Sequence, residues 1–543
     1  MKRLIRQLAL LLLILLPFLF ALKSAPAQNY DILIKNGFIL DGSGNPWFRG
    51  DIGLIGKRIA RIGYIDSGHA KKIIDATNLM VTPGFIDVHT HCDREIAEVP
   101  TVDNYILQGV TTVIGGNCGG HSYPLAELFK NIDKNGISVN FGCLVGHNTV
   151  RKEAMGYKMD PPSADELENM KNLIEQEMKA GALGFSTGLA YLPGIYSNTE
   201  ELTALASVIV RYGGIYTSHI RDQGQKITEA IQEAIEVGEN NSIPVLISHI
   251  KLAEDAVWGK PEMITRPVEE ARERSVEVFL DQYPYTATSS GFTSSFPSWS
   301  FEGGREIFLE RLKNKDAYQK IRDYVVRRRL TTTKNINKLK TIYVSRFQKH
   351  PEYEGKNLHE ILISQGRDPT IENAADLIIE IETIGGAGGI FFQMDEKDVE
   401  ALMRLPYTMH ASDGSVQVLG EGIPHPRNYG TFPRVIAHYV REKGVLSLED
   451  AIRKMTSLPA QIFRIRERGM LREGMFADIT IFDFQSFEDK ATFTDPHQYS
   501  QGLKYVIVNG EVVVEDNIHK GKLPGMIIYG PGRSQEMVDE NKE

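Results

Sequence analysis

Residues 83–91 read Pro-Gly-Phe-Ile-Asp-Val-His-Thr-His, a short apolar strand that ends in two histidines. Because alternate side chains of a strand lie on one face, His89 and His91 are expected to point the same way. Later segments repeat this pattern of a short apolar run that ends in polar residues. Strands that alternate with amphipathic helices favour a parallel (β/α)8 barrel of the TIM type, whose functional residues lie at the carboxyl ends of the strands. The eight expected strands are Phe85–His91, Val110–Asn117, Asn140–His147, Ala182–Thr187, Ile215–Ile220, Pro244–Ile250, Glu277–Tyr283 and Tyr407–Asp413.

Two of the intervening helices have recognisable ends. Ser163-Ala-Asp-Glu166 and Ser197-Asn-Thr-Glu200 match the capping box, in which the serine and the glutamate side chains satisfy free backbone N–H groups. Gly181 and Gly213 stand where these helices are expected to stop.

Strand patterns with Gly and Asn at the turns occur at both ends of the chain and predict a small β-sandwich domain built from both ends.

The barrel pattern is interrupted between Tyr285 and Tyr407 by far more residues than one helix needs. A long insertion on the active-site side is commonly a lid, although a surface decoration without a role in turnover fits the sequence equally well. The expected division is a signal peptide at 1–27, the β-sandwich at 28–82 and 466–543, and the barrel at 83–465 with a lid-like insertion at about 286–405.

The overall composition is that of a well-packed globular protein. Of the 543 residues, 42% are hydrophobic and 24% are charged, which argues against a disordered chain or a coiled coil. The formal net charge is −9 and Arg327–Arg329 is the one basic run that stands out, so a nucleic-acid binder is not expected. Three cysteines cannot form a disulfide scaffold. Nothing in these quantities specifies an oligomeric state.

The first residues have the pattern of a secretory signal peptide. Lys2, Arg3 and Arg6 precede an apolar run at Leu8–Leu22, and Ala25-Pro-Ala27 provides small residues for cleavage. The run is short for a membrane span, although an uncleaved anchor is the alternative. We therefore expect an exported protein, periplasmic or extracellular, that is not inserted in a membrane after cleavage.

Residues that bind metals gather at the expected strand ends. Taken singly, each is more often structural, because a buried Cys usually packs as a small hydrophobe and a buried His is usually only hydrogen-bonded. Six such residues at five strand ends favour a metal site, and a Cys with two His would form a zinc site with one open position. The six are His89, His91, Cys118, His219, His249 and Asp413.

Further motifs along the chain resemble one known family. They are Gly116-Asn-Cys-Gly, Gly184-Phe-Ser-Thr-Gly-Leu, Thr217-Ser-His-Ile-Arg-Asp, Ile247-Ser-His-Ile-Lys, Tyr283-Pro-Tyr and Ser412-Asp-Gly. Residues 83–91 are similar to the opening of the amidohydrolase superfamily, and residues 474–526 are similar to a closing β segment. In this order, the motifs resemble the N-acyl-D-amino-acid deacylases (D-aminoacylases) over nearly the whole chain.

The resemblance implies a zinc-dependent enzyme that hydrolyses the amide bond of N-acyl-D-amino acids, its small-molecule substrates, to a carboxylate and a free D-amino acid. It implies one tight zinc on Cys118, His219 and His249, and a second, weaker metal position on His89 and His91 with Asp413 nearby. In this resemblance Cys118 replaces the carbamylated lysine that many amidohydrolases carry after strand four. Asp413 is implied as the general base and acid that works with metal-activated water.

The resemblance also implies residues that bind the substrate. Lys251, Tyr283, Ser289 and Arg427 correspond to contacts of the substrate carboxylate, and Tyr191 to a further substrate contact. The sequence departs from the family pattern at Cys92 and His121, close to the expected second metal position and side-chain pocket.

Two other functions stay open at this point. A related amidohydrolase could act on cyclic amides, as hydantoinases and dihydroorotases do, or on dipeptides with a D-residue, but those relatives usually carry the strand-four lysine. A non-catalytic exported binding protein would be expected to lack some of the ligands, and all six are present.

Overall fold

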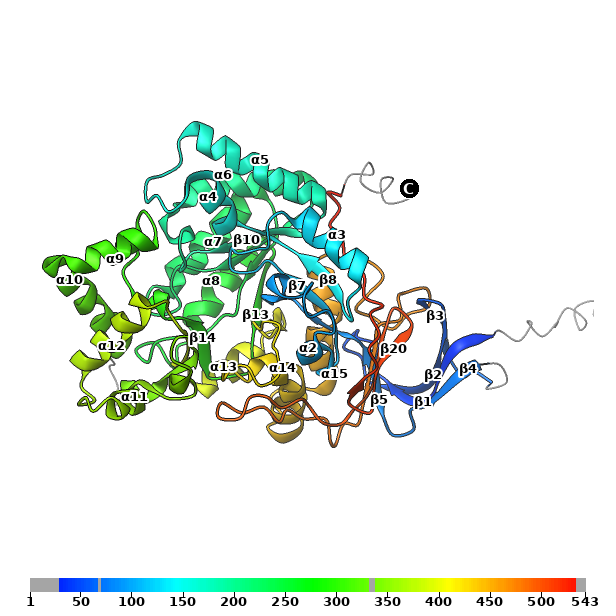
Figure 1. Ribbon diagram of the computed structural model, residues 1–543. Helices are drawn as coiled ribbons and strands as arrows, with labels where there is room; N and C mark the ends of the chain where they lie inside the picture. Colours follow the sequence, from blue (N-terminus) through cyan, green and yellow to red (C-terminus); the bar gives the residue numbers. More distant parts are fainter. Residues whose placement is uncertain (1–28, 67–69, 332–336, 534–543) are drawn as a thin grey trace, which may run out of the picture.

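The computed structural model describes residues 29–66, 70–331 and 337–533 (Figure 1). The expected signal peptide lies outside these residues. Within them, we find no helix with the length and apolar character needed to cross a membrane.

The centre of the molecule is a ring of parallel strands. The third strand is interrupted at Leu144 and therefore counts as two, β8 and β9. Successive strands pair in parallel, and the ring closes where Thr90 bridges Gly414 and the Asp413 N–H donates to the His89 carbonyl at 2.8 Å. The predicted (β/α)8 fold is thus confirmed. The strands are β6 (Phe85–Asp87), β7 (Val110–Gly115), β8 (Asn140–Cys143), β9 (Val145–Gly146), β10 (Gly184–Gly188), β11 (Ile215–His219), β12 (Val245–Ile247), β13 (Val278–Gln282) and β17 (Thr408–His410).

The strands are buried on both faces, as a parallel barrel requires. Val245 and Ile247 of β12 belong to the hydrophobic cluster that the helices share, whereas Leu246 between them belongs to a separate cluster with Ile114 and Met409. Alternate residues therefore pack outward against helices and inward against the other strands. The helices outside the insertion are α2 (Asp103–Ile106), α3 (Leu125–Asn135), α4 (His147–Met155), α5 (Ala164–Ala180), α6 (Thr199–Ala206), α7 (Ile227–Asn241), α8 (Glu262–Glu273), α14 (Arg427–Arg434), α15 (Leu448–Met455) and α16 (Ser457–Ile462).

One of the two predicted helix starts is confirmed and the other is wrong by one residue. Ser163 and Glu166 form the capping box of α5, and Gly181 ends that helix in the left-handed conformation. At α6 the N-cap is Asn198 instead of Ser197, because the Asn198 side chain accepts from the Glu201 N–H at 2.9 Å. Asparagine and serine cap equally well, so the local sequence does not discriminate between the two positions.

Strands from both chain ends form one sheet beside the barrel. β5 pairs with β18 in antiparallel fashion, which joins the N-terminal strands to the C-terminal ones. Hydrogen bonds join all of these strands into one continuous nine-stranded sheet, as expected for one β domain built from both chain ends, and most of the strands contribute to one apolar core. The strands are β1 (Tyr30–Ile39), β2 (Phe48–Ile55), β3 (Arg58–Gly63), β4 (Ala70–Asp75), β5 (Met80–Pro83), β18 (Ile479–Phe482), β19 (Leu503–Val508), β20 (Glu511–Glu515) and β21 (Ile518–His519).

The insertion is a compact unit with its own core, on the side of the barrel away from the nine-stranded sheet (Figure 1). It has a three-stranded sheet in the order β14-β16-β15, and residues such as Phe308 and Ile378 form an apolar cluster separate from that of the barrel. Its main elements are β14 (Ala287–Gly291), α9 (Arg305–Lys313), α10 (Lys315–Val325), β15 (Ile342–Arg346), α11 (Leu358–Ser364), α12 (Ile371–Thr383) and β16 (Gly388–Phe392). The helix that follows, α13 (Glu396–Met403), packs into the core of the barrel through Val399, Leu402 and Met403.

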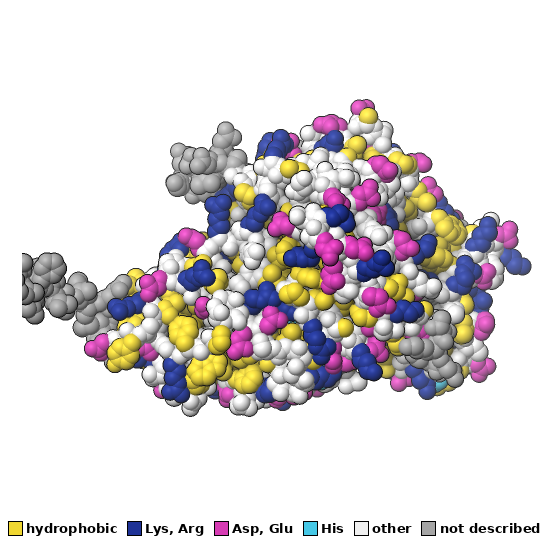
Figure 2. Space-filling model, turned by 180° about the vertical axis from the view of Figure 1, so that it is seen from behind, with side chains coloured by type: hydrophobic (Ala, Val, Ile, Leu, Met, Phe, Trp, Pro, Cys, Tyr) yellow, Lys and Arg dark blue, Asp and Glu magenta, His cyan; other side chains and the backbone are white. Residues whose placement is uncertain are grey.

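The surface carries both signs of charge. Figure 2 shows Lys and Arg side chains interspersed with Asp and Glu over the face that it presents. On this face there is no continuous basic area of the kind that nucleic-acid binding requires.

Candidate active site

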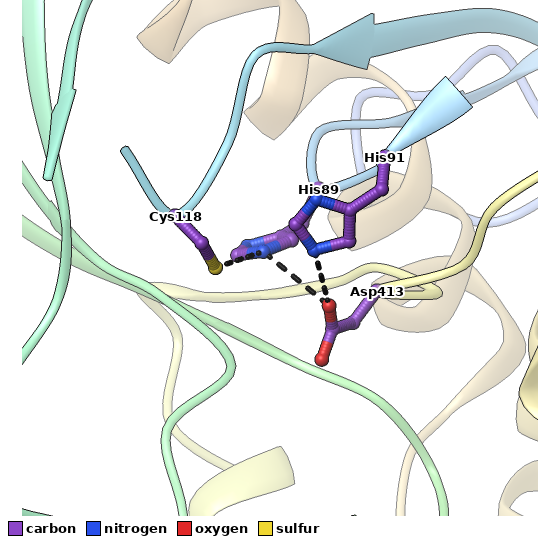
Figure 3. Close-up of side chains that lie close together, drawn as sticks. All are labelled: His89, His91, Cys118 and Asp413. Atoms are coloured by element: carbon purple, nitrogen blue, oxygen red, sulfur yellow. Dashed lines mark hydrogen bonds and ion pairs between the residues drawn. The ribbon is translucent and has the colours of Figure 1, made fainter. Parts of the chain in front are cut away.

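The six candidate ligands meet at one end of the barrel. They form two overlapping groups, and within each group the possible ligand atoms all lie within 4.8 Å of one another. One group is Cys118, His219 and His249, and the other is His89, His91, Cys118 and Asp413. The close-up in Figure 3 shows the second group converging from separate strand ends.

The first group has the donor set of a zinc site. The Cys118 Sγ lies 3.6 Å from the His219 Nδ1 and 3.3 Å from the His249 Nε2, and all three residues are buried. Burial raises the pKa of the Cys118 thiol, but the neighbouring His89 and His249 outweigh it and hold that pKa well below its ordinary value. A thiolate and two imidazoles fit zinc and leave a fourth position open.

The second group shares the Cys118 sulfur. The His89 Nε2 lies 3.2 Å from the Cys118 Sγ, and the His91 Nε2 lies 3.0 Å from the Asp413 Oδ1. These positions fit a second metal beside the first, with Cys118 common to both.

The backbone is strained at three of these residues. Cys118, His249 and Asp413 have φ angles of +53°, +35° and +51°, in a region that residues other than glycine rarely adopt. Each lies two or three residues after the end of a barrel strand, in the turn that leaves it. Strain of this kind persists where the surrounding structure enforces it, and it is concentrated at functional sites.

Residues behind the ligands hold the imidazoles in place. The Asp281 carboxylate contacts the His89 Nδ1 at 3.3 Å and accepts from the backbone N–H of His249 at 2.7 Å. The Gln223 Nε2 lies 3.1 Å from the His249 Nδ1. Contacts of this kind fix which ring nitrogen faces a metal. Neither Asp281 nor Gln223 was expected from the sequence as part of the site; the signal for Asp281 is an acidic residue inside an otherwise apolar strand.

Asp413 lies between cations. Its Oδ2 is 2.8 Å from the Arg427 Nη1, and both side chains are almost fully buried. Burial raises the pKa of the Asp413 carboxyl, but Arg427 and the nearby histidines outweigh it and hold that pKa well below its usual range. Asp413 is therefore a carboxylate at neutral pH and can accept a proton.

The implied substrate contacts lie around the same centre. Lys251 and Arg427 approach the Tyr283 ring, with charge-to-centroid distances of 5.4 Å and 4.9 Å. Burial lowers the pKa of Lys251 to about 7. Lys251, Tyr283, Ser289 and Tyr191 line a cavity of about 970 Å³ between the barrel and the insertion.

The two departures from the family pattern lie outside both groups. Cys92 is buried and accepts a hydrogen bond from the Thr90 hydroxyl, with 3.1 Å between Oγ1 and Sγ. The His121 Nδ1 accepts from the Gly146 N–H at 2.9 Å. Both therefore serve packing and backbone contacts here. Neither is close enough to join the groups that could hold a metal among the described residues.

Comparisons with known proteins agree with this geometry. The model of the amidohydrolase family matches residues 72–514. D-aminoacylase of Alcaligenes xylosoxydans xylosoxydans is 33% identical over 93% of this chain and 99% of that protein. The crystal structure of N-acyl-D-glutamate deacylase from Bordetella bronchiseptica, complexed with zinc and a phosphonate inhibitor, has a TM-score of 0.79 and 32% identity, covering 92% of this chain and all of that one.

The cyclic-amide alternative has weaker support. A D-hydantoinase structure covers 93% of this chain and all of its own, but with 16% identity and a TM-score of 0.54, which is a likeness of fold alone. By its family match, its relatives and its convergent cysteine and histidines, the chain belongs to the amidohydrolase family, in the group of the D-aminoacylases.

Proposed function

We propose that this protein hydrolyses the amide bond of N-acyl-D-amino acids and releases a carboxylate and a free D-amino acid, with zinc as its metal. The observation that carries the proposal is the convergence of Cys118, His219 and His249 beside an ionised Asp413 at a cavity large enough for such a substrate. The likeness to D-aminoacylase supports the same reaction.

Cys118, His219 and His249 would hold the zinc, and His89 and His91 would complete a second position. When bound, zinc supplies Lewis-acid chemistry that activates water and polarises the amide carbonyl. Asp281 and Gln223 keep the rings of His89 and His249 oriented for this role.

Asp413 is the proton carrier. Its carboxylate takes a proton from the attacking water and returns it to the departing nitrogen. Arg427 on Oδ2 stabilises the ionised form, so that the carboxylate is ready to accept the proton before attack.

Lys251 and Tyr283 line the cavity and would receive the substrate carboxylate. Arg427 is not part of that lining, but it lies behind it, over the Tyr283 ring and on Asp413, and would add positive charge on this side. A substrate held by its carboxylate on one side and by its amide near the metal ligands would have two fixed points. The position of the pocket for its side chain would then determine which enantiomer fits.

The test is amine release from matched N-acetyl-D and N-acetyl-L forms of Met, Leu, Phe, Glu and Asp, with and without a chelator. Metal-dependent release from the D forms alone is expected. If none of these N-acetyl amino acids were hydrolysed while cyclic amides or D-residue dipeptides were, the proposal would be contradicted.

Export of the protein is also proposed, from the cationic start, the apolar run and the Ala25-Pro-Ala27 segment. In a Gram-negative host, the protein is expected in the periplasmic fraction or the medium with Gln28 at its N-terminus. Recovery of the uncleaved chain from the cytoplasm would contradict this.

A further inference from the structure

Arg329 is a buried cation in the wall of the active-site cavity that the reaction does not use. It belongs to η7 (Val326–Leu330), the turn that follows α10 in the insertion, and it lines the cavity with 8% of its surface exposed. Its guanidinium packs on the Phe391 ring, 4.5 Å from the centroid.

In the part of the chain that the structure describes, this guanidinium contacts neutral groups. Its Nε donates to the Ser295 hydroxyl at 3.0 Å and its Nη2 donates to the Ser294 hydroxyl at 2.6 Å. Among the described residues, no carboxylate lies within ion-pair distance of it. A buried charge without a counter-charge is costly, and burial accordingly lowers the pKa of Arg329 to about 9.

Three other arginines of the same cavity are already neutralised within the protein. Arg328 pairs with Glu254 at 2.8 Å, Arg305 with Glu382 at 3.0 Å, and Arg221 with Glu233 at 2.7 Å. Arg327 also lines the cavity without a described acid beside it, but its side chain is exposed to solvent. Among the described arginines of this lining, Arg329 thus combines burial with the lack of an acid, which leaves its charge available to a ligand.

Arg329 lies in the same cavity wall as residues beside the reaction centre. The Ser294 Oγ, which accepts from Arg329, lies 3.2 Å from the Ser290 Oγ, and both serines line the cavity together with Tyr191. The Tyr191 ring lies 4.5 Å from the ring of the candidate ligand His219, centroid to centroid. Arg329 and the reaction centre therefore face one cavity, with Arg329 on the wall formed by the insertion.

We propose that Arg329 binds a second carboxylate of the substrate, distinct from the one that Lys251 and Tyr283 receive. This deepens the proposed function and rests on it: the preferred substrates are N-acyl-D-amino acids with two carboxylates. Arginine matches a carboxylate through two parallel N–H donors, and the burial of Arg329 strengthens such a pair. The second carboxylate can belong to the amino-acid side chain or to the acyl group, and the experiment distinguishes the two.

The experiment measures kcat/KM for two pairs of substrates that differ in one charge. N-acetyl-D-glutamate against N-acetyl-D-glutamine tests a side-chain carboxylate, and N-succinyl-D-leucine against N-butanoyl-D-leucine tests an acyl carboxylate. The unchanged protein is expected to prefer the acidic member of one pair. Because Arg329→Met would leave the second carboxylate without a partner, it should lower that preference about 100-fold, which corresponds to about 2.8 kcal/mol.

Arg328→Met is the matched control, because it removes a neighbouring arginine of the same cavity whose charge Glu254 already balances. It should change the preference by no more than about threefold, as expected for a partly exposed ion pair. Arg329→Lys keeps the charge but loses the two-donor fork, and should lower the preference about tenfold. If thermal unfolding shows that Arg329→Met does not fold, Arg329→Lys is the variant that tests whether Arg329 causes the preference for the acidic substrate.

Equal or faster hydrolysis of both neutral substrates by the unchanged protein would overturn the role of Arg329 and leave the proposed function standing. A preference that survives in Arg329→Met, or in Arg329→Lys if only that variant folds, would overturn it too. No hydrolysis of any of the four D-substrates would instead overturn the proposed function, and this inference with it.

Discussion

Asp413 offers its two carboxylate oxygens to different partners. Oδ1 faces the imidazole of His91 at 3.0 Å, and Oδ2 faces the guanidinium of Arg427 at 2.8 Å. Both contacts favour the ionised form, so the pKa of Asp413 stays low despite burial. An amide at this position would have nearly the same shape but could not take up a proton.

We therefore expect Asp413→Asn to lower kcat about 1,000-fold, in the middle of the roughly 100- to 10,000-fold that general acid–base catalysis contributes. Zinc content and the midpoint of thermal unfolding should stay close to those of the unchanged protein, which would exclude a loss of fold as the cause. Turnover within tenfold of the unchanged protein would contradict the role of Asp413.

The Cys118 sulfur is shared by both groups of candidate ligands. Cys118→Ala removes the thiolate, so the purified variant should lose its tightly held zinc, as measured by elemental analysis after dialysis. The other two cysteines provide matched controls, because Cys92 and Cys143 are buried and belong to neither group. Cys92→Ala and Cys143→Ala should keep their zinc, and a full zinc content in Cys118→Ala would show that Cys118 is not a ligand.

At the scale of elements, Glu201 of α6 joins two side chains of α4 in a buried cluster. Its Oε1 lies 2.8 Å from the His147 Nε2 and 3.1 Å from the Arg151 Nε. Burial raises the pKa of Glu201, but His147 and Arg151 outweigh it and lower that pKa below its ordinary value. The folded protein therefore stabilises the ionised form of Glu201 more than the unfolded chain does.

From the sign of this shift, the stabilisation is fully present above the unfolded pKa of about 4.5 and is lost as the pH falls through the folded pKa. Glu201→Gln should lower the free energy of unfolding by about 3 kcal/mol at pH 7, because it leaves Arg151 buried without a counter-charge. The difference from the unchanged protein should narrow below pH 4.5, measured by denaturant unfolding from pH 7 downward. Glu200→Gln, an exposed neighbour on the same helix, is the control and should show no such difference.

At the scale of the whole molecule, the candidate zinc ligands come from three different strand ends: Cys118 follows β7, His219 ends β11 and His249 follows β12. A metal held by all three therefore connects parts of the barrel that are far apart in the sequence. A ligand at 100 times its dissociation constant stabilises the folded state by about 2.7 kcal/mol. We expect chelation to lower the midpoint of thermal unfolding by about 5 °C, at the few degrees per kcal/mol typical of a large domain.

The control for this experiment is Cys118→Ala, whose midpoint should not respond to the chelator. An equal response of that variant would show that the chelator acts elsewhere, and no response of the unchanged protein would show that zinc does not stabilise the barrel.

The insertion completes the cavity at the same scale. It has its own core, yet Ser289, Arg329 and Phe391 face the cavity that His219 and His249 reach from the barrel. The barrel thus supplies the reacting groups, and the insertion supplies part of the wall that contacts the substrate.

The sequence by itself determined the barrel and the set of candidate ligands. An apolar run that ends in a polar residue is a local signal, and β7 followed by Cys118 or β11 ending in His219 shows it clearly. Because parallel strands place their carboxyl ends together, the local signals also predicted which residues would meet. The N-cap of α6 was misplaced by one residue, since Ser197 and Asn198 have the same capping chemistry.

The tertiary structure alone decided the contacts between residues distant in sequence. Asp281 behind His89, the continuous sheet formed through β5 and β18, and the missing counter-charge of Arg329 all depend on segments far apart in the chain. A residue's own sequence neighbours contain no information on whether a distant carboxylate will lie beside it. Arg329 is buried by Ser294, Ser295 and Phe391, which lie far from it in the sequence, and no acid among the described residues comes within ion-pair distance; both facts are properties of the folded insertion.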